Sequence, residues 1–147
     1  MSGWPAFRTD KEAAGKVFWR HHAIACAAVL IVPSLLGYIY LILFISSETK
    51  ATLSWGGVDG LTIGLFASFA AFSFYFSWIG LLMGVPLAIA ALKRGIAGWG
   101  MALLAGATVG QVVALVLSMP IALAMGPFLA LIYWIGLRLS VPGAFVG

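Results

Sequence analysis

Apolar residues fill nearly all of the chain from Ala23 onward, in runs that are each long enough to cross a bilayer. A membrane-spanning helix needs about 20 consecutive, mainly apolar residues. Polar interruptions divide the sequence into four such runs, and we place the spanning helices at residues 22–45, 62–85, 98–117 and 121–139. The pattern therefore predicts an all-α membrane protein, in which residues 1–147 form one integral membrane domain with four transmembrane helices in a compact bundle.

Residues 1–21 form the polar N-terminal part of the chain. Thr9 and Glu12 have the spacing of a capping box, so we expect a helix to begin near Asp10. This segment either lies on the bilayer surface or is a plain cytoplasmic lead-in to the first span. The apolar run that follows is longer than the roughly 7 to 15 residues of a signal peptide core, and no good small-residue cleavage site follows it. We therefore expect the first helix to be retained.

Prolines predict irregularities in the first two spans. Pro33 has no N–H and leaves the carbonyl of Val29 without its helical partner, so we expect a bend that neighbours such as Ser34 satisfy. The second run is too long for a simple crossing. We expect it to tilt or to break near Gly84 and Pro86, with a short interfacial continuation.

The start of the fourth span decides the depth of Arg138 in the membrane. A turn at Ser118-Met119-Pro120 puts Arg138 at the far interface, whereas a turn at Gly126-Pro127 buries it near mid-membrane. A guanidinium at the bilayer centre costs at least about 2.5 to 3.5 kcal/mol, and the apolar runs contain no acidic residue to pair with it. We therefore favour the first turn.

Composition and charge define the environment and the topology. Of the 147 residues, 63 % are hydrophobic and 8 % are charged, far from the soluble norm of roughly 25 % charged residues. With the favoured turn, every basic residue except Lys50 lies on one side, which predicts that both termini are cytoplasmic. The net charge of +4 comes from basic residues at the ends of apolar runs, so we expect membrane lipids and no nucleic acid as partners. Small size and composition favour a bacterial inner membrane.

The clearest motif is a row of small residues at every fourth position of the third span. Small residues let another backbone approach closely, which drives helix association in lipid. The row predicts either a docking surface for another membrane protein or a second copy, or the central helix of the chain's own bundle, packed against a similar pair in the second span. The candidate packing residues are Gly98, Ala102, Gly106, Gly110, Ala114 and Ser118 in the third span, and Gly80 and Gly84 in the second.

Polar groups are scarce within the spans. Gln111, with Thr108 one turn away, can bond to a neighbouring helix or line a polar path with Arg138, and we favour the first role. His21 and His22 point about 100° apart on a helix and cannot both bind one haem iron, so we expect headgroup contacts. The sequence has no HExxH motif, no Ser-His-Asp candidate and no cysteine cluster. We therefore predict no catalytic residues, no metal site and no cofactor.

These features favour a non-enzymatic subunit that acts through helix-helix contacts to assemble, stabilise, inhibit or protect another membrane protein. The alternative is a small self-associating transporter or channel for a neutral or lipid-like solute, with Thr108, Gln111 and Arg138 along the path. A third class is an enzyme that acts on lipids at the outer surface through Asp59 or Glu48. An activity that persists with asparagine at both positions would exclude this class.

Overall fold

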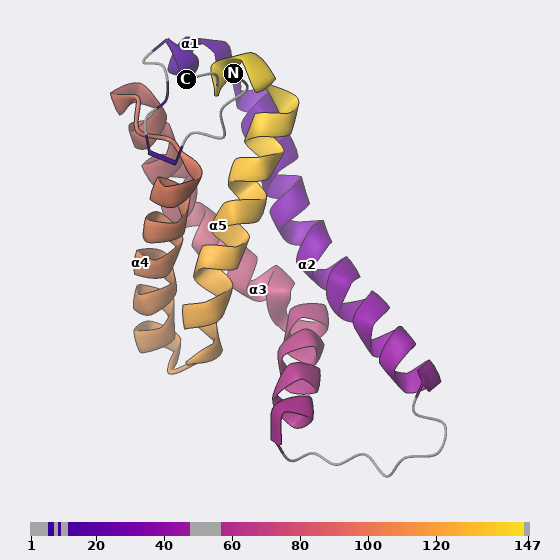
Figure 1. Cartoon of the computed structure of the whole chain (residues 1–147). Helices are drawn as coiled ribbons and strands as arrows, with labels where there is room; N and C mark the ends of the chain where they lie inside the picture. Colours follow the sequence, from indigo (N-terminus) through magenta and orange to yellow (C-terminus); the bar gives the residue numbers. More distant parts are fainter. Residues whose placement is uncertain (1–5, 8, 10–11, 48–56, 146–147) are drawn as a thin grey trace.

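The computed structural model describes residues 6–7, 9, 12–47 and 57–145. These residues form helices and their connections (Figure 1). Four helices in the described ranges contain a stretch that is long and apolar enough to cross a membrane, which confirms the four apolar helices predicted from the sequence. The elements in chain order are α1 (Ala13–Lys16), α2 (Trp19–Ser47), α3 (Gly57–Arg94), α4 (Trp99–Leu117), α5 (Ile121–Ser140) and the 3-10 helix η1 (Pro142–Ala144).

The turn between α4 and α5 is at Ser118-Met119-Pro120, the first of the two positions considered. Ser118 has a left-handed backbone with φ of 53°, and its N–H donates to the carbonyl of Ala114. The N–H of Met119 donates to the same carbonyl at 3.0 Å, so the last turn of α4 is closed by backbone hydrogen bonds. Pro127 lies inside α5, and the helix continues through it to Ser140.

The turn between α3 and α4 is a helix-ending glycine motif. Gly95 has φ of 68°, its N–H donates to Leu92 at 3.1 Å, and the N–H of Ile96 donates to Ala91 at 3.0 Å. These bonds end α3 at Arg94, as the Lys-Arg-Gly sequence indicates.

The sequence offered two alternatives for the long second run, a tilt or a break near Gly84 and Pro86, and the break is wrong, because α3 is one helix from Gly57 to Arg94. Its last turns continue the same helix and are not a separate segment. Ala91 and Leu92 are 9 % and 3 % exposed and belong to the hydrophobic core. Burial of these side chains holds the part of the helix that follows Pro86 in the bundle.

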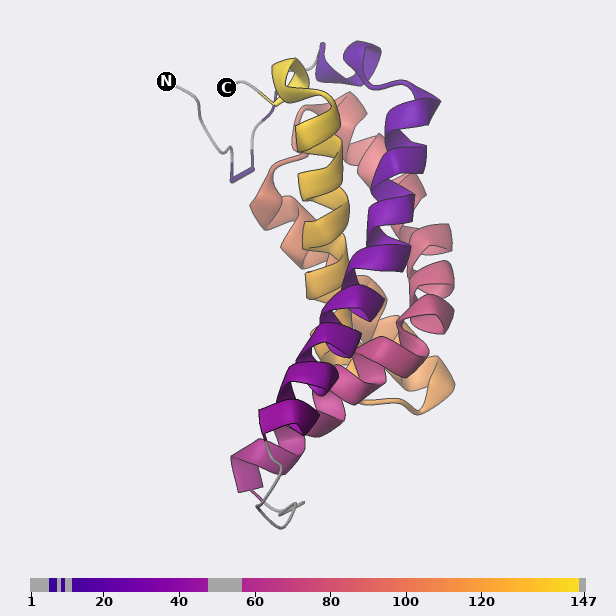
Figure 2. The same ribbon diagram turned by 90° about the vertical axis from the view of Figure 1, so that its right-hand side faces the viewer.

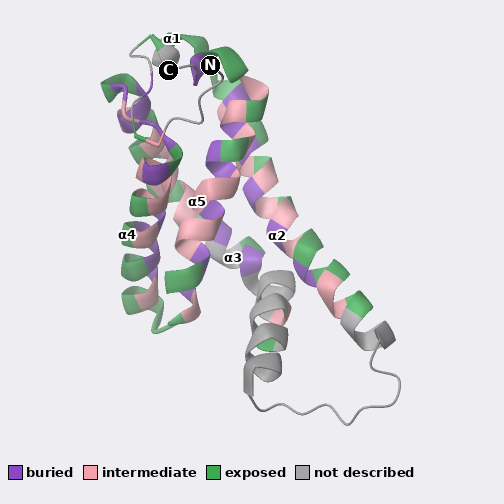
Figure 3. Ribbon diagram, in the orientation of Figure 1, coloured by how far each residue is buried: buried purple, intermediate pink, exposed green. Residues whose placement is uncertain are grey.

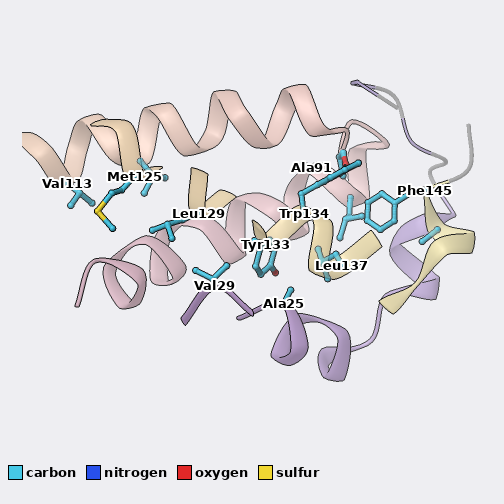
Figure 4. Close-up of a cluster of buried hydrophobic side chains, with 14 of the residues drawn as sticks. Ala25, Val29, Ala91, Val113, Met125, Leu129, Tyr133, Trp134, Leu137 and Phe145 are labelled. Carbon is cyan, nitrogen blue, oxygen red and sulfur yellow. The ribbon is translucent and has the colours of Figure 1, made fainter. Parts of the chain in front are cut away.

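Helix α5 is the centre of the bundle, because it is the most buried of the four apolar helices and contacts α2, α3, α4 and η1. Its buried side chains form a row along the bundle and meet Ala25 and Val29 of α2 on one side (Figure 4). One of the two interpretations of the small-residue row placed the third span, α4, at the centre, but α4 keeps one long face exposed (Figure 3). The buried residues of α5 are Ala122, Met125, Leu129, Tyr133, Trp134 and Leu137.

Two fully buried serines of α3 join it to α2. The hydroxyls of Ser73 and Ser34 are hydrogen-bonded to each other, and the Ser77 hydroxyl donates to the carbonyl of Val29 at 3.3 Å. That carbonyl is the one that Pro33 leaves without a helical donor. We expected a neighbour such as Ser34 to satisfy it, but a residue 48 positions away does so.

Residues before α1 hold the connection between α3 and α4. Thr9 donates from its N–H to Gly95 at 2.8 Å, and its hydroxyl accepts from the N–H of Ala97 at 3.2 Å. The capping-box spacing predicted that the Thr9 hydroxyl caps the helix that follows it, but this hydroxyl bonds to the N–H of Ala97 and caps no helix of its own. Instead α1 begins at Ala13, with Glu12 at the N-cap and no side-chain cap. The N–H of Gly100, at the start of α4, donates to Ala6 at 2.7 Å.

The described parts of both chain ends lie at the same end of the bundle (Figures 1 and 2). Lys16 of α1 donates to the carbonyl of Gly143 in η1 at 3.5 Å. Phe145 is fully buried there and meets the Trp134 ring edge-on, with ring centres 5.9 Å apart. The C-terminal segment therefore closes this end of the core.

Candidate functional site

The GxxxG pair of the third span packs inside the molecule, against α5. A Cβ atom added to Gly106 would lie 2.5 Å from the carbonyl oxygen of Gly126 and 2.7 Å from the Cβ of Ala130. A Cβ on Gly110 would lie 2.6 Å from the carbonyl oxygen of Ala122. The backbones of α4 and α5 are thus in direct contact along this row, where a side chain larger than hydrogen does not fit without a shift.

The glycine pair of α3 has a different environment from the one expected. The sequence favoured packing of the two glycine faces against each other, but a Cβ on Gly80 or Gly84 would have no neighbouring atom within 4 Å. The partner face of α4 is instead taken by α5, whose Ala122, Gly126 and Ala130 are also spaced by four residues. This spacing was the signal in the sequence that could have identified α5 as the partner.

The other small residues of the α4 row have separate roles. Gly98 is buried against the backbone of Ala6, so the N-terminal segment crosses directly over the start of α4. Ala102 and Ala114 are half-buried at the edge of the core, and Ser118 forms the exposed turn to α5.

The outer face of α4 carries a stripe of exposed residues with the alternating four- and three-residue spacing of a helix-helix seam. Leu104 is 58 % exposed and Leu115 is 82 % exposed, while Thr108 and Gln111 are exposed between them. At about 100° per residue, Gln111 lies roughly 140° around the helix from Gly106. We call Leu104, Thr108, Gln111 and Leu115 the outer stripe of α4.

Gln111 is the polar feature of this stripe. Its side-chain amide makes no hydrogen bond to the part of the chain that the structure describes. The Thr108 hydroxyl, by contrast, donates to the carbonyl of Leu104 at 2.9 Å within the same helix. An amide group that faces hydrocarbon is unfavourable unless another helix supplies a partner.

Arg138 lies in the last turn of α5, far from the outer stripe. Its Nη1 donates to the carbonyl of Phe145 at 3.3 Å, and its guanidinium carbon is 5.9 Å from the centre of the Trp134 ring. Gln111 lies about 18 Å along α4 from the end where α5 terminates. The structure therefore does not bring Thr108, Gln111 and Arg138 together along one path within a single chain.

The two histidines bond to protein groups. His21 is 8 % exposed and its Nδ1 accepts from the N–H of Phe18 at 3.0 Å. His22 is hydrogen-bonded through Nδ1 to the hydroxyl of Tyr133 on α5. The bond between His22 and Tyr133 fixes the start of α2 against α5. The described residues contain no group of three histidine, cysteine or acidic side chains close enough to hold a metal ion.

A cleft of about 310 Å³ lies between α3 and α4, with α5 as its floor. Glycines and alanines form much of its walls, including Gly80, Gly84 and Ala88 on α3 and Ala102 and Ala105 on α4. The empty space beside Gly80 and Gly84 is the reason that the cleft exists. The sequence did not predict it, because the small residues of α3 indicated a tight contact.

Within the cleft, the polar side chains are Ser77, Thr108, Tyr133, Trp134 and Arg94. The first three are hydrogen-bonded to Val29, Leu104 and His22, respectively. The indole of Trp134 donates to the carbonyl of Ala97 at 2.7 Å. Arg94 remains, at the end of α3, exposed and without a hydrogen bond or ion pair to a described residue. The cleft is thus lined mainly by apolar groups, and the Arg94 guanidinium at its end is the charged group that a ligand can bind.

Glu48 lies outside the described residues, and Asp59 lies in the first turn of α3. The arrangement that the structure does describe offers apolar surfaces, a single unpaired amide and a basic cleft end. Comparison with protein-family models, with curated proteins and with solved structures gave no match to this chain.

Proposed function

We propose that this protein is a non-enzymatic membrane subunit that binds another membrane protein through the outer stripe of α4. The unpaired amide of Gln111, exposed on a membrane-spanning helix, is the observation that carries the proposal. A hydrogen bond between membrane helices contributes about 0.6 to 2 kcal/mol, so a partner helix with a polar group at the same depth would bind preferentially here. Binding of this kind suits a role in assembling, stabilising or inhibiting the partner.

The shape of the stripe supports a helix as the partner. Leu104 and Leu115 flank the polar pair at the spacing of a left-handed crossing, in which side chains of one helix fit between those of the other. The opposite face of α4 is already occupied by α5 through Gly106 and Gly110. The outer stripe is therefore the face of α4 that is available for assembly.

The distribution of charge supports an orientation in a bacterial inner membrane with both termini in the cytoplasm. Lys16 of α1, Arg20 at the start of α2, the Lys93-Arg94 pair at the end of α3, and Arg138 in the last turn of α5 share one end of the bundle. Excess lysine and arginine mark the cytoplasmic side. We propose that the end with α1 and η1 faces the cytoplasm.

The test is purification of a tagged copy from its native membrane in mild detergent, followed by native mass spectrometry. We expect a different membrane protein in fixed stoichiometry. Gln111→Leu, which removes the amide at nearly constant volume, should weaken the complex about 3- to 30-fold. Val116→Leu is the matched control, because Val116 is 74 % exposed on α4 but lies about 100° away from Leu115. Equal complex formation by both variants would refute the role of Gln111.

The second candidate is a self-associating transporter or channel for a neutral or lipid-like solute. The outer stripe could join two copies through paired Gln111 amides, since glutamine both donates and accepts hydrogen bonds. A homo-oligomer in the same purification, together with solute leakage in proteoliposomes that Gln111→Leu abolishes, would favour this function. A monomer with no partner before and after the substitution would contradict both candidates.

A further inference from the structure

We infer that the cleft between α3 and α4 binds one acyl chain of an anionic membrane lipid, with the lipid phosphate at Arg94 and Lys93. This site shares Leu104 and Thr108 with the outer stripe of α4, but Gln111 and Leu115 lie outside it, and the inference does not depend on the partner proposed above. Four properties of the cleft lead to this ligand: its length, its depth, its apolar lining and its charge.

The length of the cleft suits an extended hydrocarbon chain. Along α4 the cleft is lined from Gly98 to Val109, a distance of about 17 Å at 1.5 Å per residue. Small residues, among them Gly80 and Gly84 on α3 and Ala102 and Ala105 on α4, leave the space between the two helices open over this length. A single extended chain can therefore lie along the cleft without displacing a side chain.

The depth of the cleft matches one leaflet of the bilayer. The hydrocarbon core of a bilayer is about 30 Å thick, so one leaflet accounts for about 15 Å. The cleft begins near Arg94 and Gly98, at the end of the bundle where α3 stops, and reaches Gly106 near the middle of α4 and Gly126 in the second turn of α5. A chain that enters from the headgroup level on this side would thus end close to the bilayer midplane.

The lining favours an apolar chain over a polar solute. Four of the five polar side chains in the cleft already have hydrogen-bond partners, and the rest of the lining is apolar side chains and glycine. A polar solute would lose its hydration and gain few hydrogen bonds in exchange. A hydrocarbon chain has no hydrogen bonds to lose and would fill the space beside Gly80 and Gly84.

The charge at the mouth selects an anionic headgroup. The exposed guanidinium of Arg94 lines the end of the cleft, and the exposed Lys93 precedes it in the chain. Neither side chain is hydrogen-bonded or ion-paired to a described residue. Arginine can bind two phosphate oxygens at once, and each basic residue near the surface adds about 1 kcal/mol of attraction to anionic lipid, or about fivefold in affinity.

The test is native mass spectrometry of the protein in mild detergent, titrated with phosphatidylglycerol or phosphatidylcholine of identical chains. We expect one phosphatidylglycerol to bind at least fivefold more tightly than phosphatidylcholine. Gly84→Leu should abolish the specific binding, because the added side chain fills the cleft without meeting another atom at its Cβ position. Gly64→Leu is the matched control: it is on the same helix, its Cβ position is also open, and it does not line the cleft.

Arg94→Gln keeps the proposal testable even if Gly84→Leu fails to fold, since Arg94 is exposed and its replacement leaves the core intact. It should reduce phosphatidylglycerol binding about fivefold and phosphatidylcholine binding by less, because the choline cation of phosphatidylcholine offsets the charge of its phosphate. Equal binding of the two lipids, or unchanged phosphatidylglycerol binding in both Arg94→Gln and folded Gly84→Leu, would overturn the inference. So would a co-purifying protein that is released by Gly84→Leu but not by Gly64→Leu, because that result would assign the cleft to a protein.

Discussion

Replacement of Gly106 by alanine tests the direct backbone contact between α4 and α5. The new methyl group would lie 2.5 Å from the carbonyl oxygen of Gly126 and 2.7 Å from the Cβ of Ala130. Carbon atoms in contact prefer a separation of about 3.5 to 4.0 Å, so the two helices would have to move apart by about 1 Å. Such overpacking costs about 1 to 3 kcal/mol.

The intrinsic preference of helices for alanine works in the opposite direction. In a helix interior, alanine is favoured over glycine by about 0.8 to 1 kcal/mol. Gly80→Ala serves as the matched control, because Gly80 also lies in a helix that is long and apolar enough to span a membrane but has no atom within 4 Å of its Cβ position. The difference between the two variants removes the propensity contribution and leaves the packing cost.

The assay is thermal unfolding in detergent micelles, followed by circular dichroism. At about 2 to 4 °C per kcal/mol, the melting temperature of Gly106→Ala should lie roughly 3 to 10 °C below that of Gly80→Ala. Gly80→Ala should melt at or slightly above the wild-type temperature. Melting temperatures of the two variants that agree within about 1 °C would refute the close contact between α4 and α5, since either position would then accept a methyl group equally well.

Two further predictions concern hydrogen bonds between distant parts of the chain. Ser77→Ala should lower the free energy of unfolding by about 1 kcal/mol, because it leaves the Val29 carbonyl unsatisfied. The same substitution should have little effect in a Pro33→Ala background, where the restored N–H can bond to that carbonyl. Additive effects of the two substitutions in a thermal-unfolding double-mutant cycle would contradict this. Thr9→Val should increase hydrogen exchange at the amide of Ala97 several-fold, because valine lacks the hydroxyl that accepts this N–H, whereas Thr9→Ser should not. Equal protection of the amide in both variants would show that the hydroxyl is not the acceptor.

The sequence predicted the local features of the fold because they depend on nearby residues. The fourth span starts after Pro120 since a proline and a left-handed residue end α4 there, and the cost of burying Arg138 at mid-membrane favoured the same position. Likewise, the Lys-Arg-Gly sequence indicated the end of α3, and Gly95 forms the turn. In each case the chemistry of a few consecutive residues was sufficient.

The candidate site was less predictable, because it depends on which helix faces meet. The sequence marked small residues in both α3 and α4 as packing candidates, but it did not show that Gly106 and Gly110 face α5 or that Gly80 and Gly84 face open space. Gly126 and Gly136 of α5 were missed, although a Cβ on Gly136 would lie 3.1 Å from the Cα of Ala25 in α2. A small side chain permits close packing without specifying the partner.

Length and hydropathy by themselves determined four apolar helices and the scarcity of ionisable groups within them. Only the tertiary structure decided that α5 is central, that Ser77 satisfies the carbonyl freed by Pro33, and that an apolar cleft separates α3 from α4. The physical reason is the solvent. In water, burial of apolar surface identifies the inner face of a helix, but in lipid every face can be apolar. Inner and outer faces are then distinguished by close packing and hydrogen bonds between residues far apart in the sequence.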